Sequence, residues 1–368
     1  MSEKYTSIHY HKYLQLEKIL SAQDPRSALD GEAAHDEMLF IIIHQVYELW
    51  FKEIAHDLGS VIEMFRTDNV DERSISTAIA RLDRIIEIQK VLVAQIRVLE
   101  TMTPLDFLDF RNYLFPASGF QSHQFRMVEL MLGLKSDRRI TYNEAPYTDA
   151  FRGEQRKILE ELEKSPSMLD LLEAWLERTP FLEFKNFHFL KAYREAVQNM
   201  LDEETRAIEE SDILTEDEKK MRLQMLGDTN SYFASVLNET RHNELIEKGE
   251  LRLSYQATMA ALLINLYRDE PILQMPYLLI SKLLEVDDLL TTWRFRHAQM
   301  VMRMLGRKTG TGGSSGHKYL RKTADEHKIF SDLHNISTLL IPRSKLPKLP
   351  TDLKKELGFY FTEANSNS

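Results

Sequence analysis

Two pairs of residues have the types and the spacing of a binding site for an aromatic anion. Phe40 and His44 are four residues apart, as are Phe107 and Arg111, so each pair shares one face of a helix. A buried Arg needs an anion, and the neighbouring ring suits an anion that carries a flat group. The ordinary alternatives stay open. A His among apolar residues is more often a core residue, and Arg111 could equally pair with a buried Glu.

His297 is a candidate metal ligand. Its predicted helix face also carries Met300, Val301 and Met304. A His on an apolar, Met-lined face suits an axial haem ligand, and Arg294 and Arg296 could contact the haem carboxylates. Core histidines are commoner than haem ligands, so this face alone is weak support.

Residues 306–316 (GRKTGTGGSSG) hold five of the 13 glycines of the chain. They lack the GxxxxGK[ST] pattern, and a predicted helix precedes them instead of a strand, which excludes a P-loop. Backbone N–H groups and hydroxyls such as that of Thr311 can hold a carboxylate. We therefore expect a mobile loop that covers a ligand, with a simple hinge as the alternative.

Two Glu-x-x-His pairs, Glu53/His56 and Glu239/His242, have the spacing found in di-iron helical bundles. Such a site also needs one inward Glu from each of two further helices. Both pairs lie among charged residues, and a Glu-rich chain produces such pairs by chance. A di-iron centre is therefore the weaker hypothesis.

Helical periodicity extends along most of the 368 residues, and Gly and Pro together are about half as frequent as usual. Capping residues, helix-breaking residues and apolar spacing predict a series of helices. Their expected ranges are 5–23, 32–66, 71–101, 104–115, 118–133, 152–164, 168–177, 186–210, 229–248, 253–267, 272–283 and 287–305, and one more helix is expected to begin at residue 215. Residues 343–352 are expected to be an extended surface segment. With no repeat and no long linker, we predict one all-α domain spanning 1–368.

The charge and the cysteine content exclude several classes of protein. A net charge of -10 argues against a nucleic-acid partner, because phosphate binding requires concentrated basic charge. The chain has no Cys, which excludes disulfides and thiolate metal sites. The apolar run 39–51 is too short and too polar to span a bilayer. We expect a cytoplasmic protein without a membrane partner.

Several of these segments resemble the tryptophan 2,3-dioxygenase family, and they follow the order of that family. The similar segments are residues 10–14, 35–52 (HDEMLFIIIHQVYELWFK), 98–111 (VLETMTPLDFLDFR), 116–126, 267–271, 293–297 and 310–316. Residues 135–230 resemble the family loosely. His317 departs from it, because Tyr is common there.

The resemblance implies an all-α, helical-bundle haem dioxygenase subunit within a homotetramer. Each subunit would hold one haem b, ferrous in the active state. The implied reaction opens the indole ring of L-tryptophan with O2 to give N-formyl-L-kynurenine, the first step of the kynurenine pathway of tryptophan catabolism.

The resemblance also implies roles for single residues around the cofactor and the indole ring. His297 would be the axial ligand of the haem iron, beside Ser118 and Gly119. His44 would accept a hydrogen bond from the indole N–H, and Phe40 and Phe107 would pack on the ring.

Further implied roles concern the amino acid end of the substrate and the neighbouring subunit. Arg111 would bind the carboxylate, and Thr311 would contact the amino acid end when loop 306–316 closes. Tyr10, Tyr13 and Leu14, in the N-terminal segment 1–24, would line the pocket of a neighbouring subunit.

Three alternatives remain open at this point. The first is a haem oxygenase of a substituted indole in specialised metabolism, although Arg111 and Thr311 favour free L-tryptophan. The second is the non-haem di-iron bundle protein. The third is a haem sensor without catalytic activity.

Overall fold

The computed structural model describes residues 7–67, 69–140, 146–306, 308 and 316–358. The regular secondary structure of these residues is almost wholly helical, as predicted. The helices are α1 (Tyr10–Tyr13), α2 (Leu16–Leu20), α3 (His35–Phe65), α4 (Glu72–Leu99), α5 (Pro104–Arg111), α6 (His123–Leu132), α7 (Gly153–Lys164), α8 (Met168–Glu177), α9 (Phe189–Glu209), α10 (Glu216–Val236), α11 (Glu239–Glu247), α12 (Tyr255–Leu266), α13 (Pro271–Leu305), α14 (Gly316–Glu326), α15 (Ser331–Asn335) and α16 (Thr351–Leu357). Two short strands, β1 (Glu183–Phe184) and β2 (Phe187–His188), form a small antiparallel hairpin.

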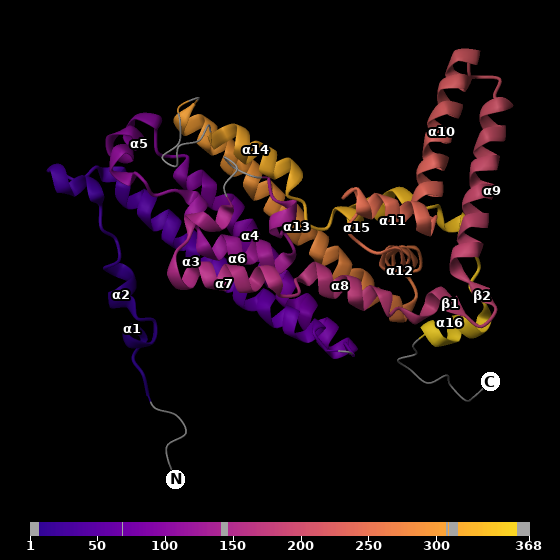
Figure 1. Ribbon diagram of the computed structural model, residues 1–368, viewed down its shortest axis with the longest axis horizontal. Helices are drawn as coiled ribbons and strands as arrows, with labels where there is room; N and C mark the ends of the chain where they lie inside the picture. Colours follow the sequence, from indigo (N-terminus) through magenta and orange to yellow (C-terminus); the bar gives the residue numbers. More distant parts are fainter. Residues whose placement is uncertain (1–6, 68, 141–145, 307, 309–315, 359–368) are drawn as a thin grey trace, which may run out of the picture.

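Three long helices, α3, α4 and α13, form the centre of the elongated molecule (Figure 1). The helices α5 and α14 lie near one end of this group, and the α9–α10 hairpin projects from the other end. The short helices α1 and α2 extend away from the body. The central helices therefore supply a rigid frame, and the shorter elements cover its ends.

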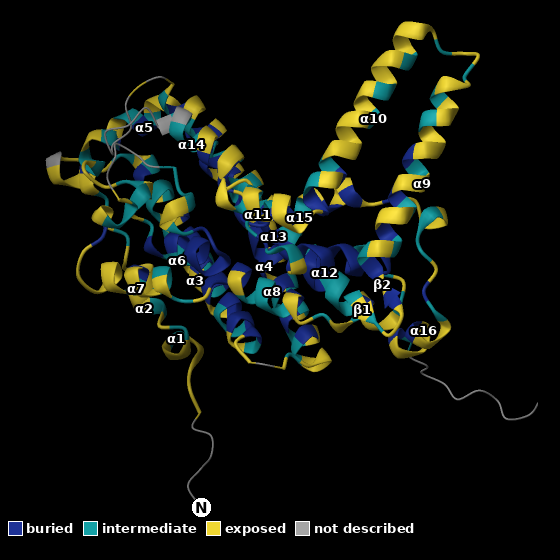
Figure 2. Ribbon diagram, turned by 45° about the vertical axis from the view of Figure 1, so that its right-hand side comes forward, coloured by how far each residue is buried: buried dark blue, intermediate teal, exposed yellow. Residues whose placement is uncertain are grey.

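The apolar core follows the contact between the central helices (Figure 2). Leu58 of α3, Leu82 of α4 and Leu283 of α13 are each 0% exposed. A buried polar contact crosses the same interface, because the amide of Gln89 donates to the carbonyl of Val286 at 3.1 Å. The long amphipathic helices are thus stabilised by burial of their shared apolar faces.

The start of α5 agrees with its sequence signals. Thr103 caps the helix, Asp106 bonds back to the Thr103 backbone, and Pro104 occupies the first turn. The predicted helix start at Ser118 is wrong. Residues Gly119–Gln121 form a single 3-10 turn, and α6 begins at His123 with Ser122 as its cap.

Several predicted helix boundaries are also wrong. The first helix is broken at Gln15, whose φ of 54° is left-handed, and α10 continues through the predicted break before 229. The predicted gap at 284–286 lies inside α13, which also contains Pro276. Buried packing on α4 outweighs the backbone hydrogen bond that this Pro removes.

The segment 343–352 is less exposed than predicted. It forms a 3-10 turn over Arg343–Lys345 and then enters α16, and Leu349 and Leu353 are both buried. These two side chains hold the segment against the body. None of the helices in the described ranges is long and apolar enough to cross a membrane.

Leu283→Ala tests the central interface. Because Leu283 is fully buried, we expect the free energy of unfolding to fall by about 2–5 kcal/mol. Ile272→Ala is a matched control on the same helix, since Ile272 is 39% exposed and should cost about 1 kcal/mol or less. Urea denaturation followed by circular dichroism measures both. Equal losses would contradict the packing described here.

Candidate functional site

A cavity of about 270 Å³ lies between α3, α4, α5, α6, α13 and α14. For comparison, a pocket beside Phe51 and Gln89 measures about 10 Å³, the space of one water. Six predicted site residues line the large cavity: Phe40, His44, Phe107, Ser118, Gly119 and His297. Segments more than 250 residues apart in sequence thus meet at one site, which the sequence pairs alone could not show.

His44 is held in one orientation on α3. Its Nδ1 lies 2.7 Å from the carbonyl oxygen of Phe40, so Nδ1 carries the proton and donates, leaving Nε2 as an acceptor. The two rings are also in contact, with centroids 4.1 Å apart. Burial lowers the pKa of His44 below its ordinary 6.5, although the Phe40 hydrogen bond opposes this. The ring stays accessible because it faces the cavity.

His297 reaches the same cavity from α13. Its ring stacks on Trp293 with centroids 5.2 Å apart and planes 9° from parallel. Burial, and after it the proximity of His44, lower the pKa of His297 to about 4, so the imidazole is neutral at pH 7. Among the residues that the structure describes, no hydrogen bond occupies either ring nitrogen. A neutral, oriented imidazole with a free lone pair is what a metal ligand requires.

Aromatic rings form much of the cavity wall. The ring centroid of Phe40 lies 5.8 Å from that of Phe107 and 5.5 Å from that of Phe110. These contacts pack α3 against α5. On another side, the ring centroid of Trp293 lies 5.0 Å from that of Phe125 and 5.7 Å from that of Phe51, which it meets edge to face. The site therefore offers flat apolar surfaces with His44 and His297 among them.

Ser118 and Gly119 line the cavity at the start of the 3-10 turn before α6. The hydroxyl of Ser118 accepts from the backbone of Phe120 at 3.4 Å, and its own N–H donates to Gln121 at 3.3 Å. Apart from the two chain neighbours of Gly119, no atom of the described residues lies within 4 Å of a Cβ added at this position. This turn thus has open space beside it.

Four predicted site residues are not cavity residues of their own chain. Arg111 is half-buried one helical turn after Phe107, outside the lining. Tyr10 and Tyr13 are 69% and 70% exposed on α1, and Leu14 follows them. Thr311 and most of loop 306–316 lie outside the described residues.

The helix α14 contributes a wall that the sequence analysis missed. Tyr319, Leu320 and Thr323 line the cavity, as does His327, the residue that follows the end of the helix. Their spacing of three to four residues is helical and could have identified this face. His317 is on the same helix but is not a lining residue. Tyr319 meets Phe120 edge to face at 5.3 Å, so α14 packs across the cavity onto the turn before α6.

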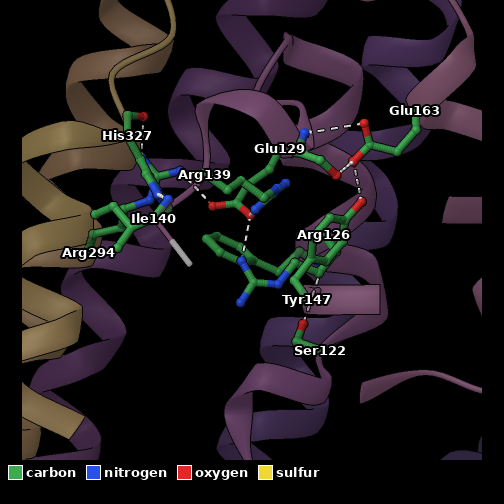
Figure 3. Close-up of polar contacts among 11 residues, drawn as sticks. Ser122, Arg126, Glu129, Arg139, Ile140, Tyr147, Glu163, Arg294 and His327 are labelled. Atoms are coloured by element: carbon green, nitrogen blue, oxygen red, sulfur yellow. Dashed lines mark hydrogen bonds and ion pairs between the residues drawn. The ribbon is translucent and has the colours of Figure 1, made fainter. Parts of the chain in front are cut away.

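A buried ionic cluster borders the cavity (Figure 3). Glu129 of α6 bonds Arg126 at 2.7 Å, Arg139 at 2.6 Å and Arg294 of α13 at 2.7 Å, and these four residues are called the Glu129 cluster below. Burial alone would raise the pKa of Glu129. The three Arg charges outweigh this effect and hold its pKa well below the usual range. Sequence spacing flags only the Arg126–Glu129 pair, three residues apart.

The end of α14 is attached to this cluster through His327. Arg294 donates to the His327 carbonyl at 3.0 Å, and the His327 Nε2 accepts from the backbone N–H of Ile140 at 3.0 Å. Burial lowers the pKa of His327 to about 3, which keeps the ring neutral and able to accept. The helices α6 and α13, the end of α14 and residues 139–140 are thus held together at one point.

The di-iron hypothesis finds no support in the described part of the chain. His56 is exposed, whereas His242 is buried and bonds the Leu253 carbonyl at 2.9 Å. No group of three or more His, Asp and Glu residues in the described ranges is arranged to hold a metal ion.

Comparison with known proteins agrees with this arrangement. A family model described as tryptophan 2,3-dioxygenase matches residues 2–340. A protein of that name from Bdellovibrio bacteriovorus is 48% identical, covering 97% of this chain and 100% of the relative. Those from Dictyostelium discoideum and Mus musculus are 47% and 46% identical, covering 96% and 98% of this chain and 88% of each relative. The chain belongs to the tryptophan 2,3-dioxygenase family.

Proposed function

We propose that this protein is a haem-dependent dioxygenase that opens the indole ring of L-tryptophan with O2 to give N-formyl-L-kynurenine. The main support is the position of His297, a neutral and unbonded imidazole among the described residues, in a cavity that also contains His44 and Phe107. The membership of the chain in its family supports the same reaction. This would be the first step of tryptophan catabolism.

The cavity fits a haem b group in three respects. His297 offers an uncommitted nitrogen to the iron. Phe125, Trp293 and Met300 offer apolar surface for a porphyrin, and the guanidinium groups of Arg126 and Arg294 offer positive charge for its two carboxylates. When bound, ferrous haem supplies the oxygen chemistry. The residues of the chain bind and orient the substrate and exclude water.

The substrate side of the proposed site has one group for each part of L-tryptophan. Phe40 and Phe107 supply surface for the indole ring, and Nε2 of His44 accepts from the indole N–H. Arg111 lies one turn from Phe107, and its long side chain can reach a carboxylate attached to a ring packed there. An indole N–H is far too weak an acid for an imidazole to deprotonate. His44 therefore positions the ring rather than acting as an obligatory base.

The remaining contacts involve segments beyond this cavity. We propose that Thr311 contacts the amino acid end of the substrate as loop 306–316 closes. Tyr10, Tyr13 and Leu14 would line the pocket of a neighbouring subunit in a homotetramer. Exposed apolar side chains on α1 to α4, including Ile42 and Leu49, support burial in an assembly. The cytoplasmic location remains a prediction from the sequence.

One experiment tests the reaction directly. The haem-loaded protein is reduced without oxygen, mixed with L-tryptophan and then with 18O2, and the product mass is recorded. We expect a product with two labelled oxygen atoms, because ring opening incorporates both atoms of O2. A product with one added oxygen, or no Soret band after haem reconstitution, would overturn the proposal.

His44→Ala tests the positioning role. Loss of one hydrogen bond of about 0.5–1.5 kcal/mol should lower kcat/KM roughly 2–13-fold and leave measurable turnover. Because its pKa is lowered, His44 stays an acceptor down to pH 6.5, and its protonation reduces kcat/KM only below that pH. The variant should lose this acid limb. Complete inactivity with haem and fold intact contradicts the role.

Arg111→Leu tests carboxylate recognition. Loss of a charged hydrogen bond of about 1.5–3 kcal/mol should raise KM for L-tryptophan roughly 10–150-fold. The preference for L-tryptophan over tryptamine, which lacks the carboxylate, should shrink by a similar factor. Arg73→Leu, an exposed position on α4, is the control for the loss of a positive charge. An unchanged preference in Arg111→Leu would remove Arg111 from the substrate site.

A further inference from the structure

The Glu129 cluster carries more positive than negative charge. Three guanidinium groups meet one carboxylate, which leaves two positive charges in excess before the haem carboxylates, proposed above to contact Arg126 and Arg294, are counted. The side chains of Glu129, Arg139 and Arg294 are 1%, 5% and 4% exposed. Charges so far from solvent are screened weakly by water and salt. Their field therefore reaches the neighbouring cavity.

The cluster borders the same cavity as His297. Arg126, Glu129 and Arg294 are lining residues, whereas Arg139 bonds Glu129 from behind. Both lining arginines lie over the ring of Phe125, with Cζ atoms 5.8 Å and 5.9 Å from its centroid. Phe125 contacts Trp293, on which His297 stacks. Buried charge and the proposed haem ligand are thus linked through two packed rings, those of Phe125 and Trp293.

Among the described residues, no carboxylate other than Glu129 cancels the charge of Arg139, whereas Arg294 also interacts with the buried carboxylate of Asp287. Within the described ranges, Nε and Nη2 of Arg139 are buried without a hydrogen-bond partner, so no second carboxylate neutralises this group. Its guanidinium lies over the ring of Tyr147, 4.4 Å from the centroid. Glu163 stands behind, where it accepts from the hydroxyl of Tyr147 at 2.7 Å. His327 is neutral, as described above.

We propose that the Glu129 cluster sets the reduction potential of the bound haem, with each guanidinium group favouring the ferrous state and the carboxylate opposing it. This inference rests on the proposed haem function. Iron(III) leaves one net positive charge on the porphyrin core and iron(II) leaves none. Buried positive charge beside the core therefore disfavours the ferric form. One electron from an external reductant neutralises the core, and no bond or proton of the cluster changes.

The charge of each member predicts the sign of its effect. Arg139→Gln removes positive charge and should lower the potential, while Glu129→Gln removes negative charge and should raise it. We expect roughly tenfold changes in the ferrous-to-ferric ratio, ~59 mV for a one-electron couple. Arg139→Lys keeps the charge and should leave the potential close to that of the wild type. The double variant Glu129→Gln/Arg139→Gln restores the original charge and should restore the potential.

The test is an anaerobic titration of each haem-loaded variant with dithionite and redox mediators, without substrate. Glu163→Gln, in the outer part of the network, is the control and should not shift the potential. Damage that admits water would lower the potential in every variant, so opposite signs separate the charge effect from a structural one. Shifts of the same sign, or none, overturn the inference.

Two further outcomes are also decisive. If Glu129→Gln does not fold, the reduction potentials of Arg139→Gln and Arg139→Lys are compared instead. Equal potentials in these two variants overturn the inference. If the wild-type protein shows no Soret band after haem reconstitution, it binds no haem. That result overturns the proposed function, and there is then no haem potential for the Glu129 cluster to set.

Discussion

The ion pair between Arg294 of α13 and Glu129 of α6 is the constraint on which the cavity depends. It joins α13, the helix that carries His297, to α6. The same guanidinium donates to the carbonyl of His327, just after the end of α14. Removal of Glu129 would leave the buried guanidinium groups of Arg139 and Arg294 without their shared carboxylate, which is strongly destabilising. The cavity therefore keeps its shape through buried charge as well as through apolar packing.

Aromatic packing transmits this rigidity to the site. Trp293 lies between Phe125 and His297, so the imidazole is oriented by a ring that is itself fixed. On the other side, the carbonyl of Phe40 fixes the tautomer of His44. Burial keeps both histidines neutral, but the hydrogen bonds of their ring nitrogens differ. One has no described hydrogen bond, and the other has a committed donor and a free acceptor.

The missed continuity of α13 has a physical cause. The continuous α13 runs through Pro276 and through the predicted break near residue 285, because packing on α4 outweighs local propensity. The missed α14 wall has a different cause. The side chains of Tyr319 and Thr323 become site residues only when α14 folds back across the cavity, and no local signal encodes that return.

The sequence by itself determined the all-α class and the pairs that share a helix turn, such as Phe40/His44 and Phe107/Arg111. Helical spacing places such residues together whatever the tertiary fold. The tertiary structure alone decided that His44 and His297 share one cavity and that Glu129 meets Arg294, 165 residues away. The physical reason is that contacts between distant segments depend on how whole helix faces pack, which no local pattern of residues specifies.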